Sequence, residues 1–175
     1  CLTAGYALIG AGWLILKSEG GLQKKAVFWA RAALWLSVIG MAAVSIASPL
    51  ADPRIFNKWF QMPQIILLLP LPILSALCFI ALWRILRQLP KENDRHAWMP
   101  FVLTMTLMLL AYIGLAYSFY PYVVPGMMTV YEAAAAPESL VIILVGAVFV
   151  LPMILGYTFL SYYIFRGKLT ELRYD

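Results

Sequence analysis

The stretch Ser139–Phe165 reads SLVIILVGAVFVLPMILGYTFLSYYIF and contains no charged residue in 27 positions. About 20 apolar residues in a helix cross the roughly 30 Å hydrocarbon core of a bilayer. This stretch therefore predicts a transmembrane helix that tilts or protrudes. Similar runs precede it, and the predicted spans are 1–16 (partial), 27–48, 65–83, 101–120 and 139–165. We predict an all-α integral membrane protein, a transmembrane four-helix bundle plus one truncated helix, in a single domain over residues 1–175.

The composition supports a membrane protein over a soluble one. The chain is 63% hydrophobic and 12% charged, whereas soluble domains are about 45–50% apolar and about 25% charged. A net charge of +5 could indicate a nucleic-acid partner. Here the cations flank apolar spans and suit an anionic membrane leaflet, so we expect no nucleic-acid binding.

The positive charges alternate along the chain. Eleven of the thirteen lysines and arginines lie in or beside the first connection, the third connection and the tail: Lys17, Lys24, Lys25, Arg31, Arg84, Arg87, Lys91, Arg95, Arg166, Lys168 and Arg173. Cytoplasmic loops of membrane proteins carry such an excess. We therefore predict a multi-pass protein with a cytoplasmic C-terminus, and with Pro49–Gln64 and Pro121–Glu138 outside.

The first apolar run is shorter than a full crossing. Cys1–Leu16 would extend about 24 Å as a helix, less than the core thickness. A leading cysteine can mark a lipidated protein. We favour the simpler interpretation that the sequence begins within a helix of a longer subunit.

Prolines mark most span boundaries, and three fall inside predicted spans. Pro49 is expected to end the second span, whereas Pro70, Pro72 and Pro152 are interior. An interior proline leaves a backbone carbonyl without its helical partner. Either a local kink or a cavity at the bend follows, and we favour the kink because proline is a routine cause of bent helices.

Catalytic chemistry is absent from the predicted spans. All eight acidic residues lie in connections or in the tail: Glu19, Asp52, Glu92, Asp94, Glu132, Glu138, Glu171 and Asp175. Proton pumps and ion-coupled transporters usually place ionisable groups at membrane depth. His96 lies in a predicted loop, which is poorly placed for a haem held within the bilayer. We interpret Cys78 and the methionines Met105, Met108 and Met153 as packing residues.

Arg31 is the cation that lies deepest in a predicted span. It is five residues into the second helix. We expect its long side chain to reach back to the cytoplasmic interface. Alternatively it faces a protein partner or a lipid headgroup, or it pairs with Glu19 in a cluster that includes Lys17.

Three stretches of the chain resemble subunit II of the cytochrome bd-type quinol oxidases. They are Trp13–Gly20 with Leu22 and Gln23, Tyr117–Pro125 followed by Thr129–Ala134, and Pro152–Lys168. In the last, a helix rich in aromatic residues ends in Phe165-Arg166-Gly167-Lys168. Tyr131 departs from the family pattern, in which this position more often resembles Trp.

The resemblance implies a role within a respiratory complex. In such an enzyme, subunit I binds haems b and d, oxidises quinol and reduces dioxygen to water. Subunit II ligates no haem in most members and packs against subunit I in the bacterial inner membrane. This chain would be the C-terminal half of that subunit, with quinol and membrane lipid as further partners. No catalytic, cofactor-binding or metal residue is expected, and Lys17, Glu19, Arg31 and Arg166 are the candidate interface or structural residues.

Two other classes of function remain open from the residues alone. Helices kinked at proline are compatible with half of a membrane transporter or permease, although buried charges and glycine-rich half-helices are missing. A membrane scaffold without an oxidase partner is the third interpretation.

Overall fold

The computed structural model of the chain describes residues 1–51, 53–60, 62, 64–89, 96–124, 127–165 and 167. The chain forms two compact units, Cys1–Ser118 and Phe119–Gly167. The predicted single domain over residues 1–175 stays a prediction beside this division. Helices dominate both units, which confirms the predicted all-α membrane class.

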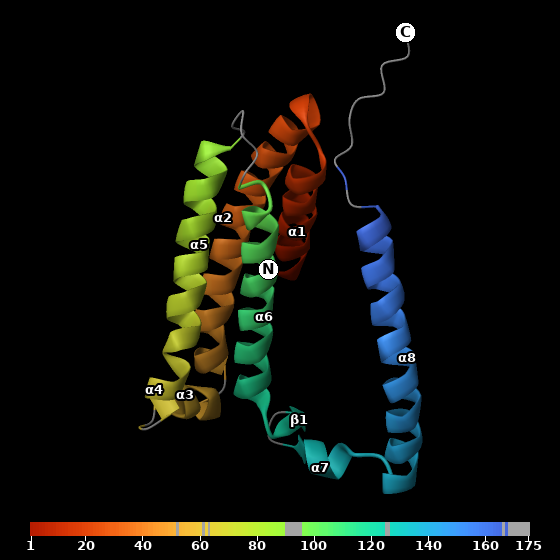
Figure 1. The fold of residues 1–175 in the computed structure, drawn as a ribbon. Coiled ribbons are helices and arrows are strands. Elements are labelled where there is room, and N and C mark those ends of the chain that lie inside the picture. The colour runs from red at the N-terminus through yellow and green to blue at the C-terminus, as the bar shows by residue number, and fades with distance from the viewer. Residues whose placement is uncertain are drawn as a thin grey trace. The chain divides into compact units, whose positions relative to one another are not determined.

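The first unit consists of helices that run back and forth beside one another (Figure 1). Its long helices are α1 (Leu2–Lys17), α2 (Gly20–Ala51), α5 (Pro70–Gln88) and α6 (Met99–Phe119). Two short helices, α3 (Pro53–Phe60) and α4 (Gln64–Leu68), connect α2 to α5. The ends of these helices alternate, so the first and third connections lie at one end and the second connection lies at the other (Figure 1).

Among the residues that the structure describes, four helices are long and apolar enough to cross a membrane. They are the segments Gly20–Leu50, Pro70–Gln88, Met99–Phe119 and Pro137–Ile164. α1 has 16 residues and is apolar but short, as predicted for the partial first span. The second helix continues beyond the predicted end of its span. Pro49 lies inside α2 near its C-terminus, and the helix reaches Ala51.

The helix α5 begins five residues after the predicted start of the third span. We predicted residues 65–83, but the long helix begins at Pro70 and ends at Gln88. Pro70 occupies the first turn of α5, where a missing N–H costs no hydrogen bond. Leu69 keeps helical angles, φ −55° and ψ −33°, between α4 and α5. Pro70 and Pro72 therefore lie in the first turn of α5, whereas Pro152 lies in the interior of α8.

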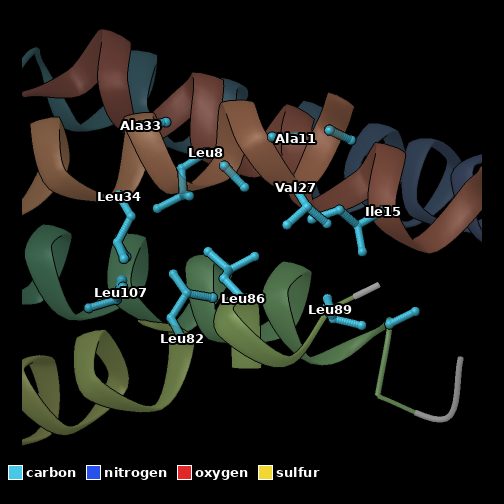
Figure 2. Close-up of a cluster of buried hydrophobic side chains, with 13 residues drawn as sticks. Leu8, Ala11, Ile15, Val27, Ala33, Leu34, Leu82, Leu86, Leu89 and Leu107 are labelled. Atoms are coloured by element: carbon cyan, nitrogen blue, oxygen red, sulfur yellow. The ribbon is translucent and has the colours of Figure 1, made fainter. Parts of the chain in front are cut away.

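A single apolar cluster holds the first unit together (Figure 2). α1 contributes Leu8, Ala11 and Ile15 to this cluster, and α5 contributes Leu82 and Leu86. α2 faces it with residues at helical spacing, several of them small: Ala26, Val27, Ala30, Ala33 and Leu34. Lipid tails are as apolar as leucine, so helices in a bilayer associate mainly through close packing, for which small residues are suited.

α1 lies close to the backbone of α6 at Gly12. A Cβ atom at this position would lie 3.1 Å from the Cα of Phe101 and 3.2 Å from its nitrogen. One residue further, the rings of Trp13 and Phe101 are in contact, with centroids 5.2 Å apart. Backbone atoms cannot move aside as a flexible side chain can, so glycine is the residue that permits this approach.

At the opposite end of the unit, two consecutive side-chain hydrogen bonds connect α3 to α6. The indole Nε1 of Trp59 donates to the hydroxyl of Ser118 at 2.9 Å. That hydroxyl donates to the carbonyl of Gly114 at 2.7 Å. The short helix α3 is thereby fastened to the C-terminal end of α6.

The second unit contains a small hairpin and a long helix. The strands β1 (Tyr122–Val124) and β2 (Met128–Thr129) pair antiparallel, and α7 (Val130–Ala133) follows them. Thr129 and Glu132 form a reciprocal capping box at the start of α7. Bonds from the Thr129 N–H and hydroxyl stabilise the carboxylate and lower the pKa of Glu132.

α8 (Pro137–Ile164) begins with Pro137 and Glu138 in its first turn. None of its 28 residues is buried within the chain. The hairpin and α7 were not foreseen within the predicted outer connection Pro121–Glu138.

Replacing Gly12 with Leu should loosen the first unit. The added side chain would meet the Phe101 backbone, and overpacking of this kind typically costs about 1–3 kcal/mol. The measurement is the midpoint of thermal unfolding of the purified protein in detergent. Gly10→Leu is the matched control, since a Cβ at Gly10 meets nothing within 4 Å. Equal midpoints for the two variants would contradict the close α1–α6 contact.

Candidate functional site

The candidate residues Lys17, Glu19 and Arg31 lie at the same end of the first unit. Here α1 ends, α2 begins and α5 ends. The turn between α1 and α2 is tight, because Gly20 adopts φ +64° and the N–H of Ser18 bonds to the carbonyl of Leu14. The buried side chain of Gln23 also donates from Nε2 to the carbonyl of Ile15 at 3.2 Å. These bonds satisfy carbonyls at the end of α1, which have no helical partner.

Arg31 joins α2 to the C-terminal end of α5. Its Nε and Nη2 donate to the carbonyl of Leu86 at 3.1 and 2.6 Å. Nη2 also donates to the carbonyl of Leu89 at 3.3 Å. The last carbonyls of a helix have no partner within it and carry its negative dipole end, so a guanidinium is well suited to them. One side chain thus bridges segments 55 and 58 positions away in sequence.

This geometry specifies what the sequence left open for Arg31. The side chain remains exposed at the cationic end, and its described bonds go to backbone carbonyls of α5. Neither of these acceptors was foreseen, because every residue supplies a carbonyl and no residue pattern identifies the one a distant arginine meets.

Lys17 and Glu19 flank the turn between α1 and α2. The Lys17 ammonium lies 5.3 Å from the centre of the Trp13 ring, within cation–π range. Glu19 is exposed. Trp13 in turn contacts Phe101 of α6. Trp13 therefore contacts both Lys17 and α6.

The fourth candidate, Arg166, lies outside the described residues, and its predicted role is not tested. His96 is exposed in the turn that precedes α6. At the end of α5, a separate cation–π pair places the Arg87 guanidinium 3.9 Å from the centre of the Trp83 ring.

Two of the small polar residues donate hydrogen bonds within their own helix. We expected Ser37, Ser45, Ser75, Thr104, Thr106, Thr158 and Ser161 to suit hydrogen bonds between helices. Thr104 and Thr106 instead donate to carbonyls four residues earlier in α6, at 2.7 and 3.0 Å. Within the described part of the chain, the buried hydroxyl of Ser37 has no hydrogen-bond partner.

The functional groups at this end of the first unit are the guanidinium of Arg31, the ammonium of Lys17 and the indole of Trp13. Among the described residues, no group of three or more His, Cys, Asp or Glu side chains could hold a metal ion. The cysteines Cys1 and Cys78 are both free thiols.

The family model of cytochrome bd terminal oxidase subunit II matches residues 1–165. The chain belongs to this family. No protein of curated function matches it. Membership in the subunit II family confirms the resemblance seen in the sequence, and it places the chain in an oxidoreductase complex that contains haem.

Replacing Arg31 with Met should weaken the joint between α2 and α5. Hydrogen bonds from a charged group contribute about 1.5–3 kcal/mol, so the midpoint of thermal unfolding in detergent should fall measurably. Turnover per assembled complex should stay close to that of the original protein.

The matched control is Lys25→Met, which removes an exposed cation from the same helix. Surface substitutions of this kind usually change stability by less than about 0.5 kcal/mol. Lost turnover with unchanged stability in the Arg31 variant would contradict its structural role.

Proposed function

We propose that this chain is the part of subunit II that ligates no haem and supports the haem-bearing subunit I of a bd-type terminal oxidase. The whole complex would oxidise quinol and reduce dioxygen to water, with haems b and d held by subunit I. The observation that carries the proposal is the match of residues 1–165 to the subunit II family.

The exposed apolar surface supports a role in assembly. Within the second unit, α8 buries none of its residues, although it carries large side chains such as Phe149, Leu155 and Phe159. The outer faces of α2 and α6 are also apolar, with Trp35, Ile39 and Leu109 exposed. Membrane helices with such faces are covered by lipid or by another subunit, and subunit I is the partner that family membership implies.

The distribution of ionisable groups supports placing the redox chemistry in the partner. All eight acidic residues and the one histidine lie outside the predicted spans. Proton routes and haem ligation need ionisable or coordinating groups at membrane depth. A supporting subunit still shapes the partner's cofactor sites, because the surrounding shell controls solvent access and dielectric.

The charges also support an orientation in the bacterial inner membrane. Lys17, Lys24 and Arg31 lie at the end of the first unit where α5 ends and the third connection begins. By the positive-inside rule this end faces the cytoplasm. The same rule places the basic tail, and with it the C-terminus, on the cytoplasmic side.

Copurification tests the proposal. Affinity-tagged full-length protein, isolated from native membranes in mild detergent, should bring down a second membrane subunit with b- and d-type haem absorption. The tagged protein produced without that subunit should contain no stoichiometric haem. A haem-free complex, solute uptake by the reconstituted protein, or haem bound by this subunit alone would contradict the proposal.

A further inference from the structure

An exposed stripe of alternating cationic and aromatic residues runs along α2 beside the end of α5. Its members are Lys24, Phe28, Arg31 and Trp35, spaced four, three and four residues apart, and all are exposed. Residues at this spacing share one face of a helix. We propose that this stripe binds one anionic phospholipid, with the headgroup phosphate between Lys24 and Arg31 and an acyl chain along Trp35.

The depth of the stripe matches the boundary between headgroups and acyl chains. α2 has 32 residues and would extend about 48 Å, well beyond a hydrocarbon core about 30 Å thick. We place the core at residues 32–51, a few residues later than the span 27–48 predicted from the sequence, because α2 continues to Ala51. Arg31 then lies at its edge, and Lys24 lies about 10 Å further out, among the headgroups. Trp35 lies one turn inside the core.

Arg31 is held in place and retains donors for a ligand. Its described bonds to Leu86 and Leu89 use Nε and Nη2. Among the described residues, none accepts a hydrogen bond from Nη1, which carries two further N–H groups. A phosphate oxygen is a strong acceptor for a guanidinium. Because the α5 carbonyls hold the side chain, little conformational entropy is lost when a phosphate binds.

The surroundings favour a lipid over a soluble anion. Phe28 is 70% exposed and Trp35 is 55% exposed, so two large rings continue the stripe toward the membrane interior. Aromatic side chains of this kind are enriched at the interface, where their rings lie beside the glycerol and upper acyl region. The N-terminal end of α2 also carries positive dipole charge near Lys24. Charge and apolar surface thus match the two ends of one amphipathic ligand.

Lys25 provides a matched control for this stripe. It follows Lys24 directly, so it lies about 100° away around the helix. It has the same charge, exposure and depth, but it does not share the face of Arg31 and Trp35. A diffuse attraction to anionic lipid would depend on both lysines equally, whereas a specific site depends on Lys24.

Photo-crosslinking to lipid tests the proposal directly. The complex that contains this chain is reconstituted in phosphatidylcholine vesicles with a minor fraction of phosphatidylglycerol. A trace of phosphatidylglycerol carrying a diazirine near its glycerol is added, and crosslinked peptides are mapped by mass spectrometry. Peptides that cover Phe28–Trp35 should be labelled. Lys24→Ala should reduce this yield about fivefold, as expected for one lysine near an anionic surface, and Lys25→Ala should retain most of it.

Several outcomes would overturn the proposal. Equal losses for the two lysine variants would indicate diffuse attraction only. Equal labelling by a phosphatidylcholine probe would exclude recognition of the anionic headgroup. Competition by free glycerol phosphate would indicate a site for a soluble phosphate ester. Crosslinks from this stripe to another subunit in place of lipid would show a protein interface. The haem spectrum of each variant complex reports separately on its assembly.

Discussion

A bilayer core offers no water to a peptide group, so every backbone N–H and carbonyl within it needs a partner from the protein. The candidate membrane spans among the described residues are long helices, which satisfy this constraint. The constraint also explains why the helix ends are where side-chain chemistry concentrates. Gln23 donates a hydrogen bond to a carbonyl at the end of α1, and Arg31 donates to a carbonyl at the end of α5. Thr129 caps the start of α7. At the cationic end of the first unit, Arg31 therefore has a structural role, because it satisfies a backbone carbonyl of α5.

Helix packing follows from the same solvent. Apolar burial contributes little between helices in lipid, so contact depends on shape and on hydrogen bonds. Gly12 and the alanines of α2 allow close approach, and Arg31 adds a charged joint between two helices. Within the second unit, α8 has no buried residue. The family to which the chain belongs implies a second subunit, and an uncovered helix of this kind is what a partner or lipid would cover.

Composition and charge predicted most of the fold, because they record where lipid and water lie. The long uncharged run at Ser139–Phe165 and the alternating cations suffice for the class and the approximate spans. The start of α5 at Pro70 was not predicted, because apolar residues continue on both sides of Pro70 and hydrophobicity alone does not locate a helix start. The partners of Arg31 escaped prediction for a different reason. Its acceptors are backbone atoms more than fifty positions away, which leave no trace in residue type.

The central claim is that helices cross the membrane with the first and third connections on the cytoplasmic side. Single cysteines at Lys25, Asn57 and His96, in a protein whose Cys1 and Cys78 are replaced by Ala, test it in intact cells with an impermeant thiol reagent. The account predicts that Asn57→Cys reacts from outside, whereas Lys25→Cys and His96→Cys react only after the inner membrane is permeabilised. Reaction of Lys25→Cys and His96→Cys from opposite faces, or of all three from one face, would contradict it.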